Sequence, residues 1–194
     1  MDDAVAHAEF HRGERDLLDG LDEVRRGPVD VGTVELLVTR PGVDERVTHG
    51  SVMVDVDSGV VGDSWLPRGN SRTPDGAADP DAQVTVMNVR AARLVAGTDD
   101  RVPLAGDQVY LDLDISTDNL PSGSRLDVGE AVLEVTTKPH TGCAKFAARF
   151  GVAALRLTAT PEGKRLRLRG LNARVLRGGT VHVGDVVRVT RPTR

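Results

Sequence analysis

The chain has 194 residues, of which 39% are hydrophobic, 28% charged and only 3% aromatic. A chain of this length can bury one hydrophobic core, and its apolar content excludes an intrinsically disordered protein. Its net charge of -4 argues against nonspecific nucleic-acid binding, which draws its affinity from a basic surface, so we expect no nucleic-acid partner.

The charged N-terminal stretch lacks the apolar run of a signal peptide, and no later stretch approaches the roughly 18 apolar residues of a membrane span. We therefore expect a cytoplasmic protein with no membrane partner. Apolar residues recur among charges within residues 4–26 in a pattern that predicts amphipathic helices, and Gly27 and Pro28 end it. Residues 1–28 are thus predicted to form a helical segment docked on a domain over residues 29–190, which should fold without it.

The abundance of valine after this segment favours strands. Residues 31–40 and 47–56 flank a Pro-Gly turn and are predicted to form a hairpin. Residues 57–82 contain many turn residues without periodicity, which predicts a long loop that is functional or mobile. Within it, Asp63 could orient a ligand, or could simply form a turn with the glycine before it.

The central part of the chain is predicted to contain a strand over residues 83–89 and a short helix from Asn88 to Ala96, closed by Gly97. Residues 109–115 show the clearest strand alternation of the chain. Their apolar face carries Val109, Leu111, Leu113 and Ile115, and the other face carries Tyr110, Asp112 and Asp114.

Residues 126–132 and 181–187 share one pattern, which predicts a strand, a tight turn of glycine and an acid, and a second strand. Between them, residues 143–151 are predicted to form a short helix that ends at its glycine. The segments 155–160 and 164–170 are predicted to form a pair of strands. Many short strands with few helices indicate a mainly β (α+β) fold, either a barrel-like domain or a sandwich.

Cys143 is the only cysteine, so it cannot form an internal disulfide. It precedes an alanine-rich predicted helix, which places its thiol at a helix N-terminus. The helix dipole and the nearby His140, Lys145 and Arg149 favour a solvent-reachable thiolate, which can attack, carry sulfur or bind a soft metal. His140 could act as its base. The alternatives are a buried, inert cysteine and a solvated loop histidine.

Arginines alternate along the predicted strand at residues 164–170, at positions Arg165, Arg167 and Arg169, and Arg174 and Arg177 follow. Such a basic stripe could hold a phosphate or a pterin phosphate. The alternative is the solvated face of an edge strand.

Five segments together resemble the MOSC domain family, named for the C-terminal domain of molybdenum cofactor sulfurase, and suggest a divergent, stand-alone bacterial-type member. The resemblance covers about residues 30–190 and depends on the order and spacing of the segments. They are SGVVGDSW (58–65), QVTVMNV (83–89), SRLDVGEAVLEV (124–135), PHTGCAKF (139–146) and NARVLRGGTVHVGDVV (172–187).

The resemblance implies a β-barrel-like domain with a few short helices and a cysteine that carries sulfur or ligates molybdenum in a pterin cofactor, molybdopterin. That role falls on Cys143, with His140 as the second catalytic candidate. The cofactor would be bound by residues near the cysteine and in the closing motif, namely Thr141, Gly142, Lys145, Arg149, Asn172 and Arg174. Pyridoxal phosphate is not expected, because fused relatives bind it through a separate domain.

The chain departs from the family pattern at two places. LDLDIS at 111–116 stands where cofactor-holding members carry an arginine and an Asn-Leu pair, and Ser64 follows Asp63 in place of an arginine. The acids of LDLDIS would have to face away from a cofactor phosphate. We expect a ligand to lie over the loop from His140 to Cys143, covered by residues 57–82.

The leading functional hypothesis is a molybdenum-cofactor-linked oxidoreductase, such as a reductase of N-hydroxylated compounds, or a sulfur-carrier or sulfur-transfer protein. Its partners would be a small-molecule substrate, or a protein that donates sulfur or electrons. The alternatives are a non-enzymatic thiol or small-anion binding module without molybdenum, and a structural barrel with an inert cysteine.

Overall fold

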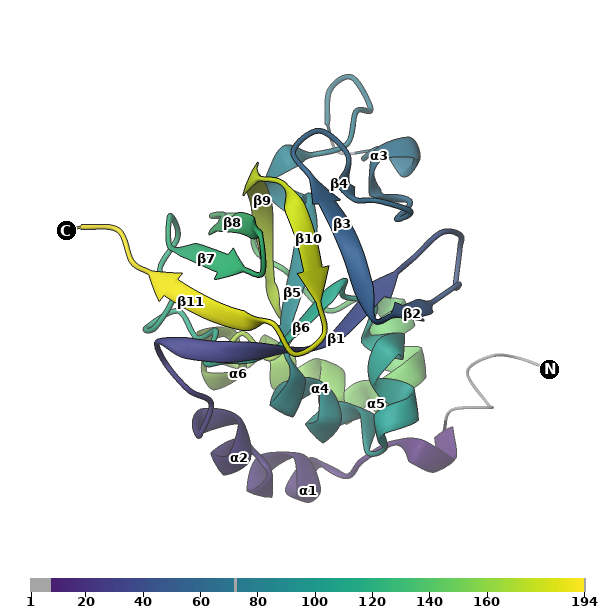
Figure 1. Cartoon of the computed structure of the whole chain (residues 1–194). Helices are drawn as coiled ribbons and strands as arrows, with labels where there is room; N and C mark the ends of the chain where they lie inside the picture. The colour runs from purple at the N-terminus through teal and green to yellow at the C-terminus, as the bar shows by residue number, and fades with distance from the viewer. Residues whose placement is uncertain (1–7, 72, 194) are drawn as a thin grey trace.

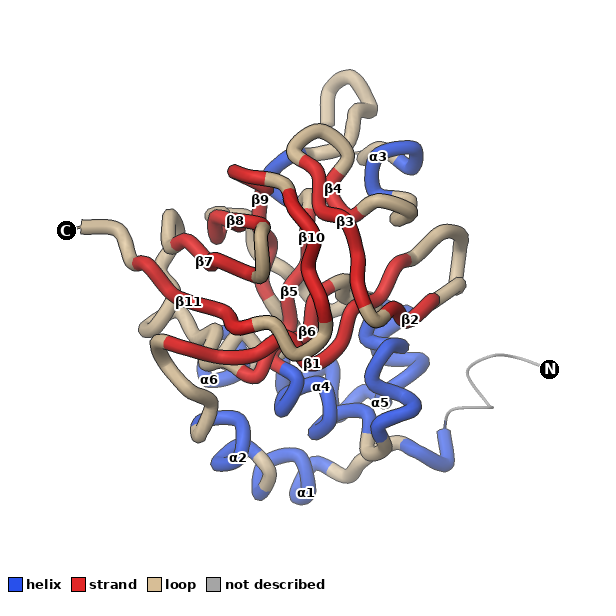
Figure 2. Tube along the Cα trace, in the orientation of Figure 1, coloured by secondary structure: helices blue, strands red, loops and turns tan. Residues whose placement is uncertain are grey.

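The computed structural model describes residues 8–71 and 73–193, so residues 1–7 of the predicted N-terminal segment lie outside the described range. Its centre is a closed barrel of seven strands (Figures 1 and 2). Around the barrel these are β1 (Val31–Thr39), β6 (Val109–Asp112), β5 (Val84–Asn88), β9 (Leu171–Arg177), β8 (Ala131–Val135), β7 (Arg125–Val128) and β11 (Val186–Thr190), which pairs back with β1. Because the barrel closes, none of these seven strands is left as an open edge over its whole length.

A small second sheet of β10 (Gly179–His182), β3 (Ser51–Asp55) and β4 (Gly59–Val60) lies beside the barrel. The short strand β2 (Val47–His49) pairs antiparallel with the end of β1. The predicted hairpin is present between β1 and β2. The strand predicted over residues 47–56 breaks at Gly50, after which β3 joins the second sheet. The predicted loop over residues 57–82 is irregular apart from β4, the single turn α3 (Trp65–Arg68) and the 3-10 turn η2 (Pro80–Ala82).

Aliphatic side chains fill the barrel, and the alternation predicted over residues 109–115 holds. Leu111, Leu113 and Ile115 are fully buried inside it, although β6 itself ends at Asp112. Tyr110 faces the opposite side, where its hydroxyl donates to the carbonyl of Val102 at 3.2 Å. Both faces of this strand are therefore buried over most of its length.

Two glycines turn the chain at the positions that the repeated pattern predicts. Gly129 lies between β7 and β8 with φ 56°, and Gly184 lies between β10 and β11 with φ 92°. These are left-handed backbone conformations that glycine adopts without a steric penalty. The turn at Gly184 carries the chain from the small sheet into the barrel.

A layer of helices covers the side of the barrel that is lowest in Figure 1. Its central helix, α4 (Val89–Ala96), ends where predicted and begins one residue after the predicted start, Asn88. The side chain of Asn88 accepts a hydrogen bond from the N–H of Arg90 at 2.8 Å, which caps the start of the helix, and Gly97 follows its end. The 3-10 helix η3 (Asp99–Ala105) then leads back to β6.

The N-terminal segment contains η1 (Ala8–Phe10), α1 (Glu14–Asp19) and α2 (Leu21–Arg25), and it packs on this helical layer. Leu17, Leu21 and Val24 are buried in the same cluster as side chains of α4. Whether the barrel folds without this segment stays a prediction.

The strands predicted over residues 155–160 and 164–170 are wrong, because both segments lie in or beside helices: α5 (Ala144–Ala159) and α6 (Pro161–Arg165). Phe146 and Phe150 before Gly151, and Ala154 and Leu157 after it, are buried in one hydrophobic cluster, and this burial outweighs the local alternation of leucine and polar residues.

The helix predicted over residues 143–151 ends at its glycine as expected, because Gly151 is non-helical, with φ 90° and ψ 158°. A second helical segment, which was not predicted, follows directly and completes α5 to Ala159. Thr160 then caps α6, with its hydroxyl accepting from the N–H of Gly163 at 2.9 Å. Of the helices that the structure describes, none is long and apolar enough to cross a membrane.

Candidate functional site

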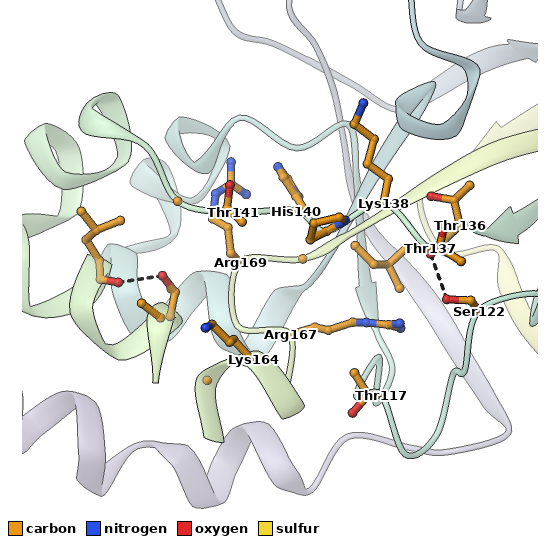
Figure 3. Close-up of a pocket in the computed structure, with 18 residues that line it drawn as sticks. Thr117, Ser122, Thr136, Thr137, Lys138, His140, Thr141, Lys164, Arg167 and Arg169 are labelled. Atoms are coloured by element: carbon orange, nitrogen blue, oxygen red, sulfur yellow. Dashed lines mark hydrogen bonds between the residues drawn. The ribbon is translucent and has the colours of Figure 1, made fainter. Parts of the chain in front are cut away.

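A pocket of about 380 Å³ opens beside the barrel, where the segment that precedes the lone cysteine meets the helical layer (Figure 3). One wall is the continuous run from Thr136 to Gly142. The other walls come from the C-terminal part of α5, from α6 and from residues 167–171, and Thr117 and Ser122 complete the pocket. Its size suits a small ligand.

Basic side chains line this pocket, and no acidic side chain of the residues that the structure describes does. Lys138 and Arg169 each form an ion pair with an acid outside the lining. In the described part of the chain, Lys164 and Arg167 have no carboxylate within ion-pair distance. Serine and threonine hydroxyls supply further hydrogen-bonding groups. The lining therefore favours an anionic ligand.

Asp107, which is fully buried, joins two of the lining residues. Arg169 donates from Nη1 to Oδ2 of Asp107 at 2.6 Å and from Nη2 to the carbonyl of Ala105 at 3.0 Å. Nδ1 of His140 lies 3.2 Å from Oδ1 of Asp107, although neither atom makes a hydrogen bond of good geometry. The carboxylate thus stands between a guanidinium and an imidazole, and it favours the tautomer with the proton on Nδ1.

Burial, together with the guanidinium groups of Arg169 and Arg40, holds the pKa of His140 well below its ordinary value. The imidazole is therefore neutral near pH 7, and its Nε2 is free to accept a hydrogen bond. Burial also raises the pKa of Asp107, while the ion pair with Arg169 opposes that rise. Because the guanidinium is only 2.6 Å away, we assign the carboxylate as ionised near neutral pH.

Gly170 lets the chain pass close to this network. Its φ is 96°, and a Cβ atom here would lie 2.5 Å from the carbonyl oxygen of Val86 and 3.1 Å from both Oδ1 of Asp107 and Nδ1 of His140. Only glycine fits this backbone conformation and this space together. The Arg169 ion pair therefore depends on glycine at the next position.

Cys143 lies at the N-terminus of α5 and is exposed, as predicted. It directly follows the lining run that ends at Gly142, but it is not itself among the residues that line the pocket. Its backbone is extended, with φ -132° and ψ 176°, and its side chain makes no capping hydrogen bond. The thiol is therefore available at the end of one pocket wall.

Lys145 and Arg149, the cations expected beside the thiol, both interact with Asp44 in the loop between β1 and β2. Nζ of Lys145 lies 2.9 Å from the Asp44 carboxylate, and Nη2 of Arg149 lies 2.6 Å from it. Neither residue lines the pocket. Their role in holding a cofactor stays a prediction.

The two candidates of the closing motif differ in position. Arg174 pairs with Glu134 on the outside of the barrel at 2.6 Å. Asn172 is buried behind the pocket wall, where its Nδ2 donates to the carbonyl of Lys138 at 3.2 Å and its own carbonyl accepts from the N–H of Thr136 at 3.0 Å. Asn172 therefore shapes the wall from behind, whereas Thr141 and Gly142 line the pocket directly.

The predicted basic stripe is wrong, because Arg165, Arg167 and Arg169 lie in α6 and the turn after it, whereas only Arg174 and Arg177 lie on a strand, β9. Arg165 is on the surface of α6, paired with Glu162 at 2.8 Å and with Asp118 at 2.7 Å. Arg167 and Arg169 both line the pocket, at different sides of the turn.

The acids of LDLDIS do not line the pocket. Asp112 pairs with Arg90 of α4 at 2.5 Å, and Asp114 accepts from the N–H of Ser116 at 2.8 Å. This departure from the family pattern therefore leaves the charge of the lining unchanged.

Asp63 forms a buried ion pair with Arg40, at 2.9 Å, and accepts from the N–H of Trp65. It ties the end of β1 to the loop and does not reach the pocket. No other described residue of 57–82 lines the pocket either, although Asp79 pairs with Lys138 of its wall. The expectation that this loop covers a bound ligand stays a prediction.

Sequence reasoning missed Asp107 and Gly170. An isolated acid or glycine between two predicted elements is typical of turns, so neither residue carries a signal of its own. The ion pair between Asp107 and Arg169 joins positions 62 residues apart, which no local pattern reports.

The fold and the site define the class of the protein, a closed seven-strand β-barrel domain with a cationic pocket and a lone, exposed cysteine at the end of one pocket wall. The model of the MOSC domain family matches residues 75–188, more than half of the chain. The chain therefore belongs to the MOSC domain family, as the motifs predicted. A comparison with curated proteins found no match.

Solved structures of similar fold support the same architecture. The crystal structure of the YUAD protein from Bacillus subtilis has a TM-score of 0.63 at 16% identity, covering 82% of this chain and 95% of that one. YiiM from Escherichia coli has a TM-score of 0.52 at 17% identity, covering 83% of this chain and 71% of that one. At these identities the likeness shows the fold alone.

Proposed function

We propose that the pocket beside Cys143 binds a molybdenum cofactor and that the chain acts as a molybdenum-cofactor-linked oxidoreductase or as a sulfur-carrier protein. The observation that carries this proposal is the position of the exposed thiol, which directly follows a run of pocket-lining residues in a chain of the MOSC domain family. A thiolate is a soft ligand that suits such a metal or a transferable sulfur atom.

The residues of the pocket fit a phosphate-bearing pterin. The lining contains lysine and arginine side chains and several hydroxyls, and no carboxylate that would repel a phosphate. Among the described residues, no group of three histidine, cysteine, aspartate or glutamate side chains could hold a metal ion. A metal beside Cys143 would therefore need further ligands from the cofactor itself.

Each candidate residue has a distinct part in this proposal. The cofactor would supply the redox or sulfur chemistry. Cys143 would bind its metal or carry the sulfur atom, and Thr141 and Gly142 would contact it from the pocket wall. His140, neutral and with its Nδ1 3.2 Å from Oδ1 of Asp107, would accept a hydrogen bond at Nε2 from a substrate hydroxyl or amine.

The test is to purify the protein from a host that makes the cofactor, and to measure molybdenum by elemental analysis and oxidised pterin by fluorescence. We expect both at a stoichiometry near one per chain, and we expect Cys143→Ser to lose reductase activity toward N-hydroxylated compounds or sulfur transfer while keeping its fold. Equal activity in the Ser variant would contradict the proposal, as would a metal bound elsewhere.

A second function is favoured by one specific observation, which is that the cations line the pocket while Cys143 does not. This pattern suits a small-anion binding module whose thiol takes no part. If the purified protein contains neither molybdenum nor pterin but binds phosphate, this second function replaces the first.

A further inference from the structure

We infer that Arg167 anchors a phosphate group, so that the ligand of this pocket is a phosphate ester with its phosphate beside Arg167, Thr117 and Ser122. The inference deepens the proposed function. It depends on that function only for the identity of the group to which the phosphate is attached, which would be the pterin. Figure 3 shows the Arg167 side chain extending toward Thr117 and Ser122, away from His140 and Thr141.

The position of Arg167 is held by its backbone and by two carbonyl groups. It is one of two non-glycine residues with positive φ in the described chain, at 48°. A side chain in this region costs about 1 kcal/mol, which the surrounding contacts must offset. Its Nη1 donates to the carbonyls of Leu120 at 2.7 Å and Ile115 at 3.2 Å. The guanidinium is therefore fixed before any ligand arrives.

The charge of Arg167 is not balanced by the described part of the protein. The side chain is half-buried, no carboxylate lies within ion-pair distance, and burial lowers its pKa. Its carbonyl partners use only Nη1, so Nε and Nη2 remain as donors to a ligand. A partly buried cation without a counter-ion is unfavourable, and a bound anion removes that cost.

The neighbours of Arg167 favour a phosphate over a single carboxylate. The hydroxyls of Thr117 and Ser122 make long hydrogen bonds to carbonyls, at 3.4 and 3.2 Å, and a phosphate oxygen offers a better acceptor. The free donors of one guanidinium and these two hydroxyls match a dianion with three terminal oxygens. Lys164 also lines the pocket, but Figure 3 shows its side chain extending away from Arg167, so it adds positive charge without a direct contact.

The remaining space sets the direction of the ligand. The pocket of about 380 Å³ is much larger than a phosphate and extends to the wall that ends at Gly142, before Cys143. A phosphate beside Arg167 would therefore leave the rest of the ester along that wall, with its far end toward the thiol.

The test is titration of the protein with inorganic phosphate, followed by two-dimensional NMR of the backbone amides. We expect saturable shifts at residues 117–122 and 164–170. Arg167→Gln should weaken binding at least about tenfold, because a charge-assisted bidentate contact is lost. Arg165→Gln is the matched control, because Arg165 is two positions away but pairs with Glu162 and Asp118 outside the pocket, and its affinity should stay within about twofold.

Thr117→Val keeps the inference testable if Arg167→Gln does not fold, because Thr117 is exposed and the loss of its hydroxyl should weaken phosphate binding about threefold. The inference would be overturned if the wild type showed no saturable phosphate binding. It would also be overturned if both pocket variants bound phosphate as tightly as the wild type. Molybdenum and pterin retained equally by Arg167→Gln would overturn it while leaving the proposed function intact. If phosphate binding requires Arg167 but the purified protein contains neither molybdenum nor pterin, the inference stands and the proposed function is contradicted.

Discussion

Nδ1 of His140 lies 3.2 Å from Oδ1 of Asp107, so a loop residue beside the thiol faces a carboxylate that has no exposed surface. The same carboxylate accepts from Arg169 at 2.6 Å. This arrangement connects the segment before Cys143 to the loop before β6 and to the turn after α6. Substitutions of Asp107 should therefore affect both stability and the site.

Replacing Asp107 with Asn should destabilise the protein by about 3–5 kcal/mol, because the substitution leaves Arg169 buried without its counter-ion. Urea unfolding of both proteins measures the change. Asp118→Asn is the control, since Asp118 is mostly exposed and its pair with Arg165 should contribute less than about 1 kcal/mol. Equal effects of the two substitutions would contradict this prediction.

Stability should fall with pH below about 6.5 because of His140. The folded pKa is lowered, so the unfolded chain binds a proton that the folded protein does not, and the free energy of unfolding decreases by up to about 1.4 kcal/mol per pH unit as pH falls. The His140→Gln variant lacks this contribution of His140 to the pH dependence. Any contribution of Asp107 is common to both proteins, so it does not affect the comparison. Denaturation curves between pH 7 and pH 5 check this, and parallel pH profiles of the two proteins would rule it out.

Gly170→Ala should destabilise the protein more than Gly184→Ala. Both positions have positive φ, 96° and 92°, so alanine costs about 1–2 kcal/mol at either one. A Cβ at Gly184 meets no atom within 4 Å, whereas at Gly170 it overlaps the carbonyl of Val86 and crowds the Asp107 network. We expect about 1–3 kcal/mol of additional destabilisation at Gly170, measured by thermal and urea unfolding.

Cys143 should react with iodoacetamide in the folded protein, because it is exposed and holds no capping hydrogen bond. The rate in native buffer should be within about tenfold of the rate in urea, measured by intact mass. Cys143→Ser should change the free energy of unfolding by less than about 0.5 kcal/mol. Full protection of the native thiol would mean that the cysteine is buried in solution.

A chain that begins at Pro28 should retain a cooperative barrel with a lower melting temperature. The loss follows from the burial of Leu17, Leu21 and Val24 against α4, each contributing about 1.5–3 kcal/mol. Two single substitutions locate the effect: Leu17→Ala should cost about 2–5 kcal/mol, and the neighbouring Leu18→Ala, which is half exposed, about 0.5 kcal/mol or less. An insoluble or molten truncated chain would show that the helices belong to the core.

The sequence by itself determined the features that depend on neighbours in the chain. The cap and end of α4, the glycine turns at residues 129 and 184, and the alternation over residues 109–115 all follow from local backbone and side-chain chemistry. The order of the motifs also identified the family correctly. These signals are short-range, so they survive without knowledge of the packing.

Tertiary structure decided how charges pair and which face of a segment is buried. Residues 155–159 alternate like a strand but are helical, because Ala154 and Leu157 are buried in the same cluster as Phe146 and Phe150. Lys145 and Arg149 are drawn to Asp44, roughly a hundred positions away in the chain, and Asp107 meets His140 and Arg169 only when three separate loops converge. Such contacts depend on which distant segments the closed barrel brings together. A local sequence pattern does not encode contacts between residues that are far apart in the chain.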